Sequence, residues 1–160
     1  MLPTIDPSLI LSHAAALVSA YLLAFPIGWD REKVARSAGL RTFPLVALAS
    51  CGFIQASESL MTDAPQATAY VVEGLITGMG FIGGGAILKH GVSVYGTATA
   101  ASLWATGAIG MAVGLGSYEV AIIISLITFL TLKLLPLLKE EENADSPALA
   151  KAAVKKPKNR

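Results

Sequence analysis

The sequence is poor in charged residues and contains one cysteine. Charged side chains make up 14% of the chain, whereas soluble domains carry about 25%. The hydrophobic share is 54% and the mean hydropathy is +0.62. This composition argues against a large soluble domain. With Cys51 alone, no intramolecular disulfide can form.

The sequence motifs of soluble enzymes are missing as well. The chain has no Walker loop, no dinucleotide fingerprint, no Cys/His metal quartet and no Gly-x-Ser-x-Gly turn. The missing nucleotide site excludes an ATP-driven pump. A formal net charge of +1 gives no sign of nucleic-acid binding. We therefore expect a protein that is not an enzyme, has no bound cofactor and does not bind nucleic acid.

Long apolar intervals separate the few clusters of charge. A membrane-spanning helix needs about 20 apolar residues. Five intervals approach or reach that length, and they predict an all-α integral membrane fold, a bundle of about five transmembrane helices. The predicted spans are Pro7 to Trp29, Leu40 to Ser57, Ala67 to Leu88, Val92 to Leu115 and Val120 to Leu138.

The distribution of lysine and arginine predicts the orientation. Short cytoplasmic loops are enriched in basic residues. The segment before the first span has none, whereas the loop after it has Arg31, Lys33, Arg36 and Arg41. We expect the N-terminus outside and the C-terminus in the cytoplasm. Residues 1–138 then form the transmembrane domain, and residues 139–160 form a disordered, charged cytoplasmic tail.

Glycine is concentrated in the predicted third and fourth spans. Three pairs are spaced four residues apart: Gly74 and Gly78, Gly80 and Gly84, Gly110 and Gly114. Small residues at this spacing let membrane helices approach closely, which predicts Gly-rich packing between the third and fourth spans. The triplet Gly83-Gly84-Gly85 also permits a break in the third helix, where freed carbonyls would coordinate a cation.

Polar residues in these two spans are candidate ligands for an ion. Glu73 lies about two turns into the third span, where an acidic side chain is by default a functional candidate. Neutral oxygens beside one carboxylate suit Mg²⁺, and a proton would fit equally. Alternatively, Glu73 reaches the headgroups and the hydroxyls bond carbonyls of their own helix. The candidate ligands of this possible Mg²⁺ site are Glu73, Thr77, Thr99, Ser102 and Thr106.

Four ordered motifs resemble those of the MgtC/SapB membrane family. They are Gly28-Trp29-Asp30-Arg31-Glu32, Gly39-Leu40-Arg41-Thr42, the run from Gly74 to Leu88, and the run from Thr99 to Thr106 followed by Gly107 to Gly114. The resemblance marks these motif positions as the ones to examine: Asp30, Arg31, Glu32, Gly39, Arg41, Thr42, Gly78, Gly80, Gly83, Gly85 and Trp104. The chain has Asp30 where relatives commonly have Glu, and Glu73 where many have Gln.

The resemblance implies a multi-pass protein of the bacterial inner membrane, linked to growth in low magnesium. Better-known members are described as regulators of membrane partners, including ATP synthase. Longer members add a soluble cytoplasmic domain, so this chain corresponds to a short form. Its expected partners are the lipid bilayer and either further copies of itself or other membrane proteins. Two functions remain open, a membrane regulator and a carrier of magnesium or another cation, the latter with its site at Glu73 and the Thr99, Ser102 and Thr106 stripe.

Overall fold

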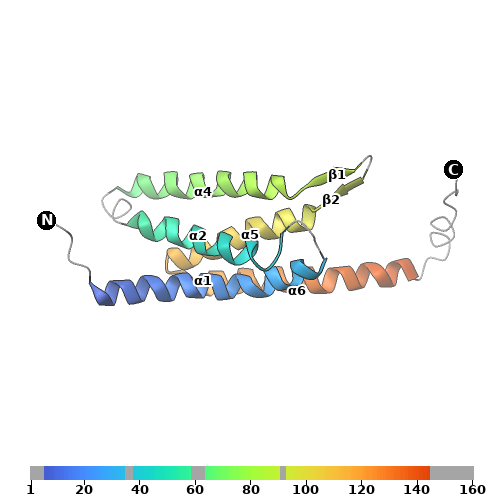
Figure 1. Ribbon diagram of the computed structural model, residues 1–160, viewed down its shortest axis with the longest axis horizontal. Helices are drawn as coiled ribbons and strands as arrows, with labels where there is room; N and C mark the ends of the chain where they lie inside the picture. Colours follow the sequence, from blue (N-terminus) through green and yellow to red (C-terminus); the bar gives the residue numbers. More distant parts are fainter. Residues whose placement is uncertain (1–5, 35–37, 59–63, 91–92, 145–160) are drawn as a thin grey trace.

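A computed structural model describes residues 6–34, 38–58, 64–90 and 93–144. These residues form the helices α1 (Pro7–Val34), α2 (Thr42–Ala56), α4 (Pro65–Gly85), α5 (Thr97–Gly114) and α6 (Tyr118–Ala144). Successive helices run in opposite directions, so α1 begins at one end of the bundle and α6 ends at the other (Figure 1). The predicted all-helical architecture of five long segments is confirmed for this part of the chain.

Asp6 fixes the start of α1. Its carboxylate oxygen Oδ1 accepts hydrogen bonds from the backbone N–H of Ser8 at 2.9 Å and from the Ser8 hydroxyl at 2.8 Å. Both bonds hold the pKa of the Asp6 carboxyl below its ordinary value. Pro7 follows at the first helical position, where its missing N–H costs nothing. The sequence therefore begins α1 with an N-cap and a proline in their usual places.

The predicted ends of the first and last spans fall short of the observed ends of α1 and α6. α1 continues past Trp29 to Val34, so Asp30, Arg31 and Glu32 belong to the helix and not to a solvated loop. α6 continues to Ala144, into the segment expected to be a disordered tail. Residues 145–160 of that predicted tail lie outside the described residues.

The connection between α4 and α5 is a β-hairpin, which the sequence analysis did not predict. β1 (Leu88–His90) pairs antiparallel with β2 (Ser93–Tyr95), and Lys89 lies opposite Val94. α5 therefore begins at Thr97, later than the predicted Val92. Gly96 ends the hairpin with φ +86°, and a Cβ there would collide with the carbonyl oxygen of Ala86. Only glycine fits this turn.

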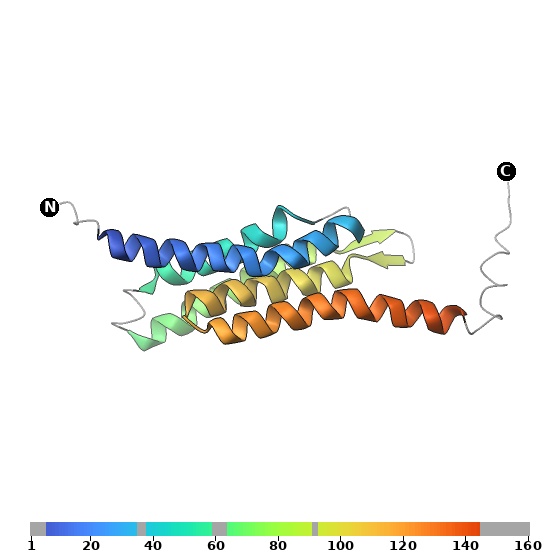
Figure 2. The same cartoon turned by 90° about the horizontal axis from the view of Figure 1, so that it is seen from below.

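α5 is the central helix and contacts α1, α2, α4 and α6, as the view of Figure 2 also shows. Its buried apolar side chains include Leu103, Ile109 and Val113. The approach to α2 is very close, because a Cβ on Gly110 would meet the Ala47 carbonyl and one on Gly114 would meet Ile54. Glycine thus sets the distance between α5 and α2.

The expected glycine packing between the third and fourth spans needs correction. α4 contacts α5 where Gly83 faces the backbone of Ala100 and where Met79 packs on Gly107. The remaining glycines of α4 have open space where a Cβ would lie: Gly74, Gly78, Gly80, Gly84 and Gly85. Of the three predicted glycine pairs, the one whose two members both pack closely against another helix is Gly110 and Gly114 of α5. The helix that they pack against is α2. The glycine triplet occupies the last turn of α4 and does not break the helix.

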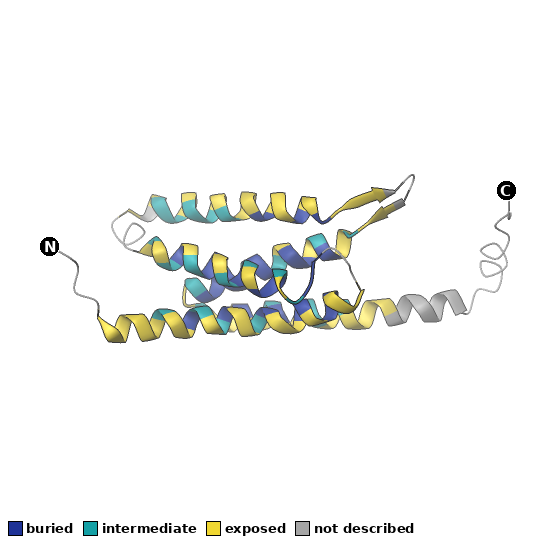
Figure 3. Cartoon of the chain, viewed as in Figure 1, coloured by how far each residue is buried: buried dark blue, intermediate teal, exposed yellow. Residues whose placement is uncertain are grey.

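Many residues on the outside of the bundle are exposed (Figure 3), and a large share of them are large apolar residues. Two helices within the described ranges, Pro7–Val34 and the segment Tyr118–Pro136 of α6, are long and apolar enough to cross a membrane. Most of their side chains are exposed, among them Leu11, Ile123 and Ile127. An apolar exterior over a core of small residues is compatible with a membrane bundle.

Candidate functional site

Asp30 and Arg31 form a buried pair of opposite charges near the end of α1. Each residue is only 5% exposed. The guanidinium of Arg31 donates to Asp30 Oδ2 through Nε at 3.1 Å and also through Nη2. Two bonds to one carboxylate are geometrically specific and stronger than bonds between neutral groups. The two charges therefore neutralise each other within the bundle.

Lys133 of α6 adds a second cation to this pair. Its ammonium nitrogen lies 3.6 Å from Asp30 Oδ1, and its side chain is 48% exposed. Eight residues earlier on the same helix, Ser125 donates a hydrogen bond of 2.6 Å to the carbonyl of Leu23 in α1. These two polar contacts join α1 to α6. They fix the register of the two helices more precisely than apolar packing alone would.

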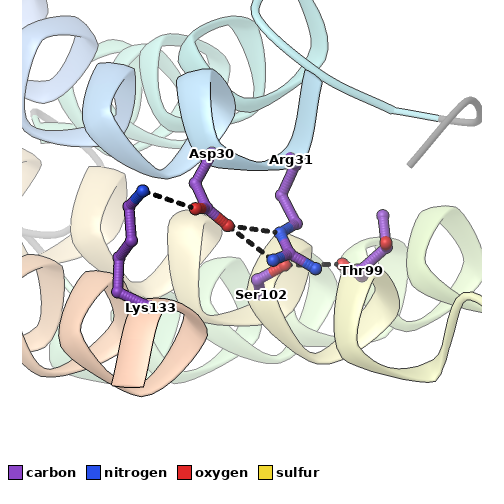
Figure 4. A network of polar contacts seen from close by, with 5 residues as sticks. All are labelled: Asp30, Arg31, Thr99, Ser102 and Lys133. Carbon is purple, nitrogen blue, oxygen red and sulfur yellow. Dashed lines mark hydrogen bonds and ion pairs between the residues drawn. The ribbon is translucent and has the colours of Figure 1, made fainter. Parts of the chain in front are cut away.

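α5, which carries the hydroxyl stripe, packs against α1, the helix of Asp30 and Arg31. Figure 4 shows the guanidinium of Arg31 reaching from α1 toward Ser102 and Thr99. All three hydroxyl residues of the stripe are buried. Ser102 donates to the carbonyl of Thr99 at 3.0 Å, and Thr106 donates to the carbonyl of Ser102 at 2.8 Å. The hydroxyls therefore bond back to their own helix, the alternative considered for them above.

Glu73 and Thr77 are not part of this cluster. Both are exposed on α4, and the contact of Met79 with Gly107 sets the register of α4 against α5. At about 1.5 Å per residue, Glu73 lies roughly 9 Å beyond that contact, whereas Thr99 lies roughly 12 Å away in the opposite direction. The structure thus separates Glu73 from the hydroxyl stripe. Within the described ranges no three His, Cys, Asp or Glu side chains gather as a metal site.

Glu32 and Gly39 join the first two motifs. Glu32 Oε2 accepts a hydrogen bond of 2.9 Å from the backbone N–H of Leu40. A Cβ on Gly39 would occupy the place of that carboxylate. Gly39 in turn accepts bonds from the N–H groups of Thr42 and Phe43 at the start of α2. A bond across the connection therefore positions the first turn of α2 relative to α1.

The other motif residues lie in several environments. Arg41 is exposed, and Arg41, Thr42 and Gly78 line a cleft between α2 and α4. Gly83 is buried against α5, whereas Gly80 and Gly85 are exposed. Trp104 is 51% exposed on α5. The motifs thus contribute to one buried cluster, one cleft and part of the outer surface.

Sequence reasoning missed the role of Lys133. One signal was available, because Lys133 is the single charged residue between Glu119 and Lys139. A lone charge in an apolar helix needs a partner or water. Its partner Asp30 could not be identified, since the two residues are far apart in the sequence.

Comparison with known proteins gives one consistent result. The model of the MgtC family matches residues 17–141. Protein MgtC of Salmonella typhimurium strain LT2 is 39% identical over 111 residues, which cover 69% of this chain and 47% of that protein. Protein MgtC of Brucella abortus strain 2308 is 40% identical over 107 residues, covering 66% and 44% of the two chains. The chain spans less than half the length of these relatives within the matched regions. No solved structure matches the chain.

Proposed function

This chain belongs to the MgtC family, and from that membership we propose that it acts in the bacterial inner membrane during adaptation to low magnesium, by regulating membrane partners. We propose no enzymatic activity and no resident cofactor for it. Its N-terminus would lie outside and its C-terminus in the cytoplasm. The family relationship supports a role in magnesium-related physiology, and the choice of regulator over carrier rests on the charge arrangement in the bundle.

The observation that carries this choice is the position of Arg31. Its guanidinium stays charged at any physiological pH and points toward Thr99 and Ser102 of the hydroxyl stripe (Figure 4). A fixed positive charge in a low-dielectric interior opposes the entry of Mg²⁺ at the same place. Asp30 offers little compensation, because it already pairs with Arg31 and Lys133. The arrangement favours a structural role for the buried charges.

The open face of α4 supports contact with partners. Gly80 and Gly84 are exposed and have no atom within 4 Å of a Cβ placed on them. Small residues on a membrane helix allow the backbone of another helix to approach closely. This face would meet a second copy of the chain or a different membrane protein.

The alternative, a magnesium or proton-coupled carrier, keeps Glu73 as its central residue. An acidic side chain on a membrane helix is a default functional candidate. In this alternative Glu73 would act at the exposed face of α4, away from Thr99 and Ser102. It would need oxygen ligands from another molecule or from water.

Flux measurements separate the two functions. The purified protein is reconstituted into liposomes, and magnesium and proton flux are measured for the native chain, for Glu73→Gln and for the control Glu119→Gln at the start of α6. We expect flux equal to that of empty liposomes in all three. Flux that Glu73→Gln abolishes and Glu119→Gln preserves would establish the carrier. A host strain lacking the gene, tested for growth in low magnesium, should recover with the native chain and with Glu73→Gln alike.

A further inference from the structure

An apolar cleft separates α2 from α4. Both helices pack on α5, α2 through Gly110 and α4 through Gly83 and Met79, yet they make little contact with each other. The cleft between them has a volume of about 800 Å³. Figure 1 shows both helices on the same side of the bundle. The arrangement leaves a groove with α2 and α4 as its two walls.

The walls of this groove are mostly apolar. Leu45, Val46 and Phe53 face it from α2, and Val71, Leu75 and Ile82 face it from α4. Gly74 and Gly78 also line the groove and leave open space where side chains would otherwise project. Contact with water is unfavourable for such apolar walls. On the outside of a membrane bundle, the groove would instead be filled by a hydrocarbon chain.

Arg41 supplies the one charge among the described lining residues. It stands at the end of the groove where α2 begins, next to Thr42. Its side chain is exposed and has no hydrogen bond or ion pair within the described part of the chain. The N-terminus of α2 adds a partial positive charge at this end. The groove therefore combines a long apolar body with a positive end, which is complementary to a lipid with an anionic headgroup.

The length of the groove fits the same ligand. From Arg41 to Ser57 the wall formed by α2 extends about 24 Å at 1.5 Å per residue. One leaflet contributes about 15 Å of the hydrocarbon thickness. The hydrocarbon of one leaflet is thus shorter than the groove, so an acyl chain can lie entirely within the groove while the lipid headgroup stays at Arg41.

We propose that the groove between α2 and α4 binds an anionic phospholipid, with its phosphate at Arg41 and Thr42 and an acyl chain against Leu75 and Phe53. The basic loop predicts that this end faces the cytoplasm, where basic pockets between membrane helices bind anionic headgroups. The planar guanidinium donates two parallel bonds to a phosphate. If an uncharged helix face of a second copy of the chain filled the groove instead, Arg41 would have no anionic partner.

Native mass spectrometry of lipid-bound protein tests this site. The full chain is reconstituted in an equimolar mixture of phosphatidylglycerol and phosphatidylcholine, extracted in mild detergent, and scored for the lipid retained. We expect phosphatidylglycerol to be retained in preference, and Arg41→Gln to reduce that preference about tenfold, as the loss of a charge-assisted bond would. Lys89→Gln, which removes an exposed charge in β1, should leave the preference unchanged.

A second pair of variants tests the apolar part of the groove. Gly78→Leu adds a side chain inside the groove, because Gly78 lines the groove and a Cβ there meets open space, and Gly85→Leu adds the same side chain at an open position outside the lining. We expect Gly78→Leu to lose the retained lipid and Gly85→Leu to keep it, both with native helix content by circular dichroism. Equal retention of the two lipids by the native chain would overturn the proposal. The proposal would also be overturned if Gly78→Leu left lipid retention unchanged. The same holds if Phe53→Cys formed disulfide crosslinks between copies of the chain.

Discussion

Lys133 of α6 reaches Asp30 of α1, with 3.6 Å between the ammonium nitrogen and carboxylate oxygen Oδ1. Asp30 therefore interacts with two cations, because Arg31 donates a hydrogen bond to its other carboxylate oxygen, Oδ2. The two cations are not equivalent. Arg31 is buried, whereas the side chain of Lys133 is half exposed. Removing one or the other should therefore have very different effects on stability.

Asp30→Asn should destabilise the fold strongly. The substitution leaves the Arg31 guanidinium buried without a carboxylate, and losing one partner of a buried pair costs about 3–5 kcal/mol. The measurement is the thermal midpoint of the purified protein in detergent, with Glu119→Gln as the matched control. The double variant Asp30→Leu with Arg31→Leu should recover much of the loss, because it removes both charges together. A single variant as stable as the native chain would show that the pair is not buried as described.

Lys133→Met should have a much smaller effect. Its side chain is half exposed and the pair with Asp30 is long, and exposed pairs contribute about 0.2–1 kcal/mol. The methionine retains most of the apolar stem that packs along α6. The same thermal measurement checks this expectation. A loss as large as that of Asp30→Asn would mean that Lys133 is the main partner of the carboxylate.

Gly110→Ala should separate α2 from α5. The new Cβ would collide with the Ala47 carbonyl, a backbone atom that cannot turn aside, and such overpacking costs about 1–3 kcal/mol or more. Gly80→Ala is the control, since its Cβ meets open space and alanine improves helix propensity by about 1 kcal/mol. The two variants should shift the thermal midpoint in opposite directions. Equal shifts would contradict the close approach of the two helices.

Glu32→Ala and Gly39→Ala should act through the same contact. The first removes the acceptor of the Leu40 N–H, and the second displaces it, because a Cβ on Gly39 would occupy the carboxylate position. Each loss should be about 1 kcal/mol. A double-mutant cycle in unfolding free energy should then show that the double variant costs little more than one single variant. Fully additive losses would disprove this coupling.

Cysteine labelling should place the hairpin and the start of α6 on opposite sides of the membrane. In a Cys51→Ala background, Glu119→Cys should react with a membrane-impermeant thiol reagent in intact cells. Lys89→Cys should react only after the cells are made permeable, because the basic loops are predicted to be cytoplasmic. Labelling of both positions from outside would refute the predicted orientation.

The helices were largely predictable because their signal is local. Runs of apolar residues between charged clusters located all five described helices, with errors at the boundaries. The hairpin at Leu88–His90 and Ser93–Tyr95 was missed because the basic residues Lys89 and His90 were read as a short turn between two spans, with the second strand assigned to the start of the fourth span. A strand pair of three residues each offers too little alternation to be distinguished from helix.

The candidate site was less predictable because it depends on contacts that are distant in sequence. The motif at Asp30 and Arg31 was identified through the family resemblance, but its burial depends on α5 and on Lys133. Two positions were considered for Glu73, an ion site inside the bundle and a side chain that reaches the headgroups. Its helix has glycine or apolar residues on every side, so the pattern did not indicate which face would pack on α5.

The central position of α5 has a consequence for biosynthesis. A chain emerges from the ribosome from its N-terminus, so α1, α2 and α4 are all made before the helix that holds them together. α1 and α2 contact each other directly, but α4 has few contacts until α5 arrives. During translation α4 must therefore remain without its main packing partner until the hairpin turns the chain back and α5 has been made. Substitutions that weaken this late docking should appear first as rapid degradation of the newly made protein.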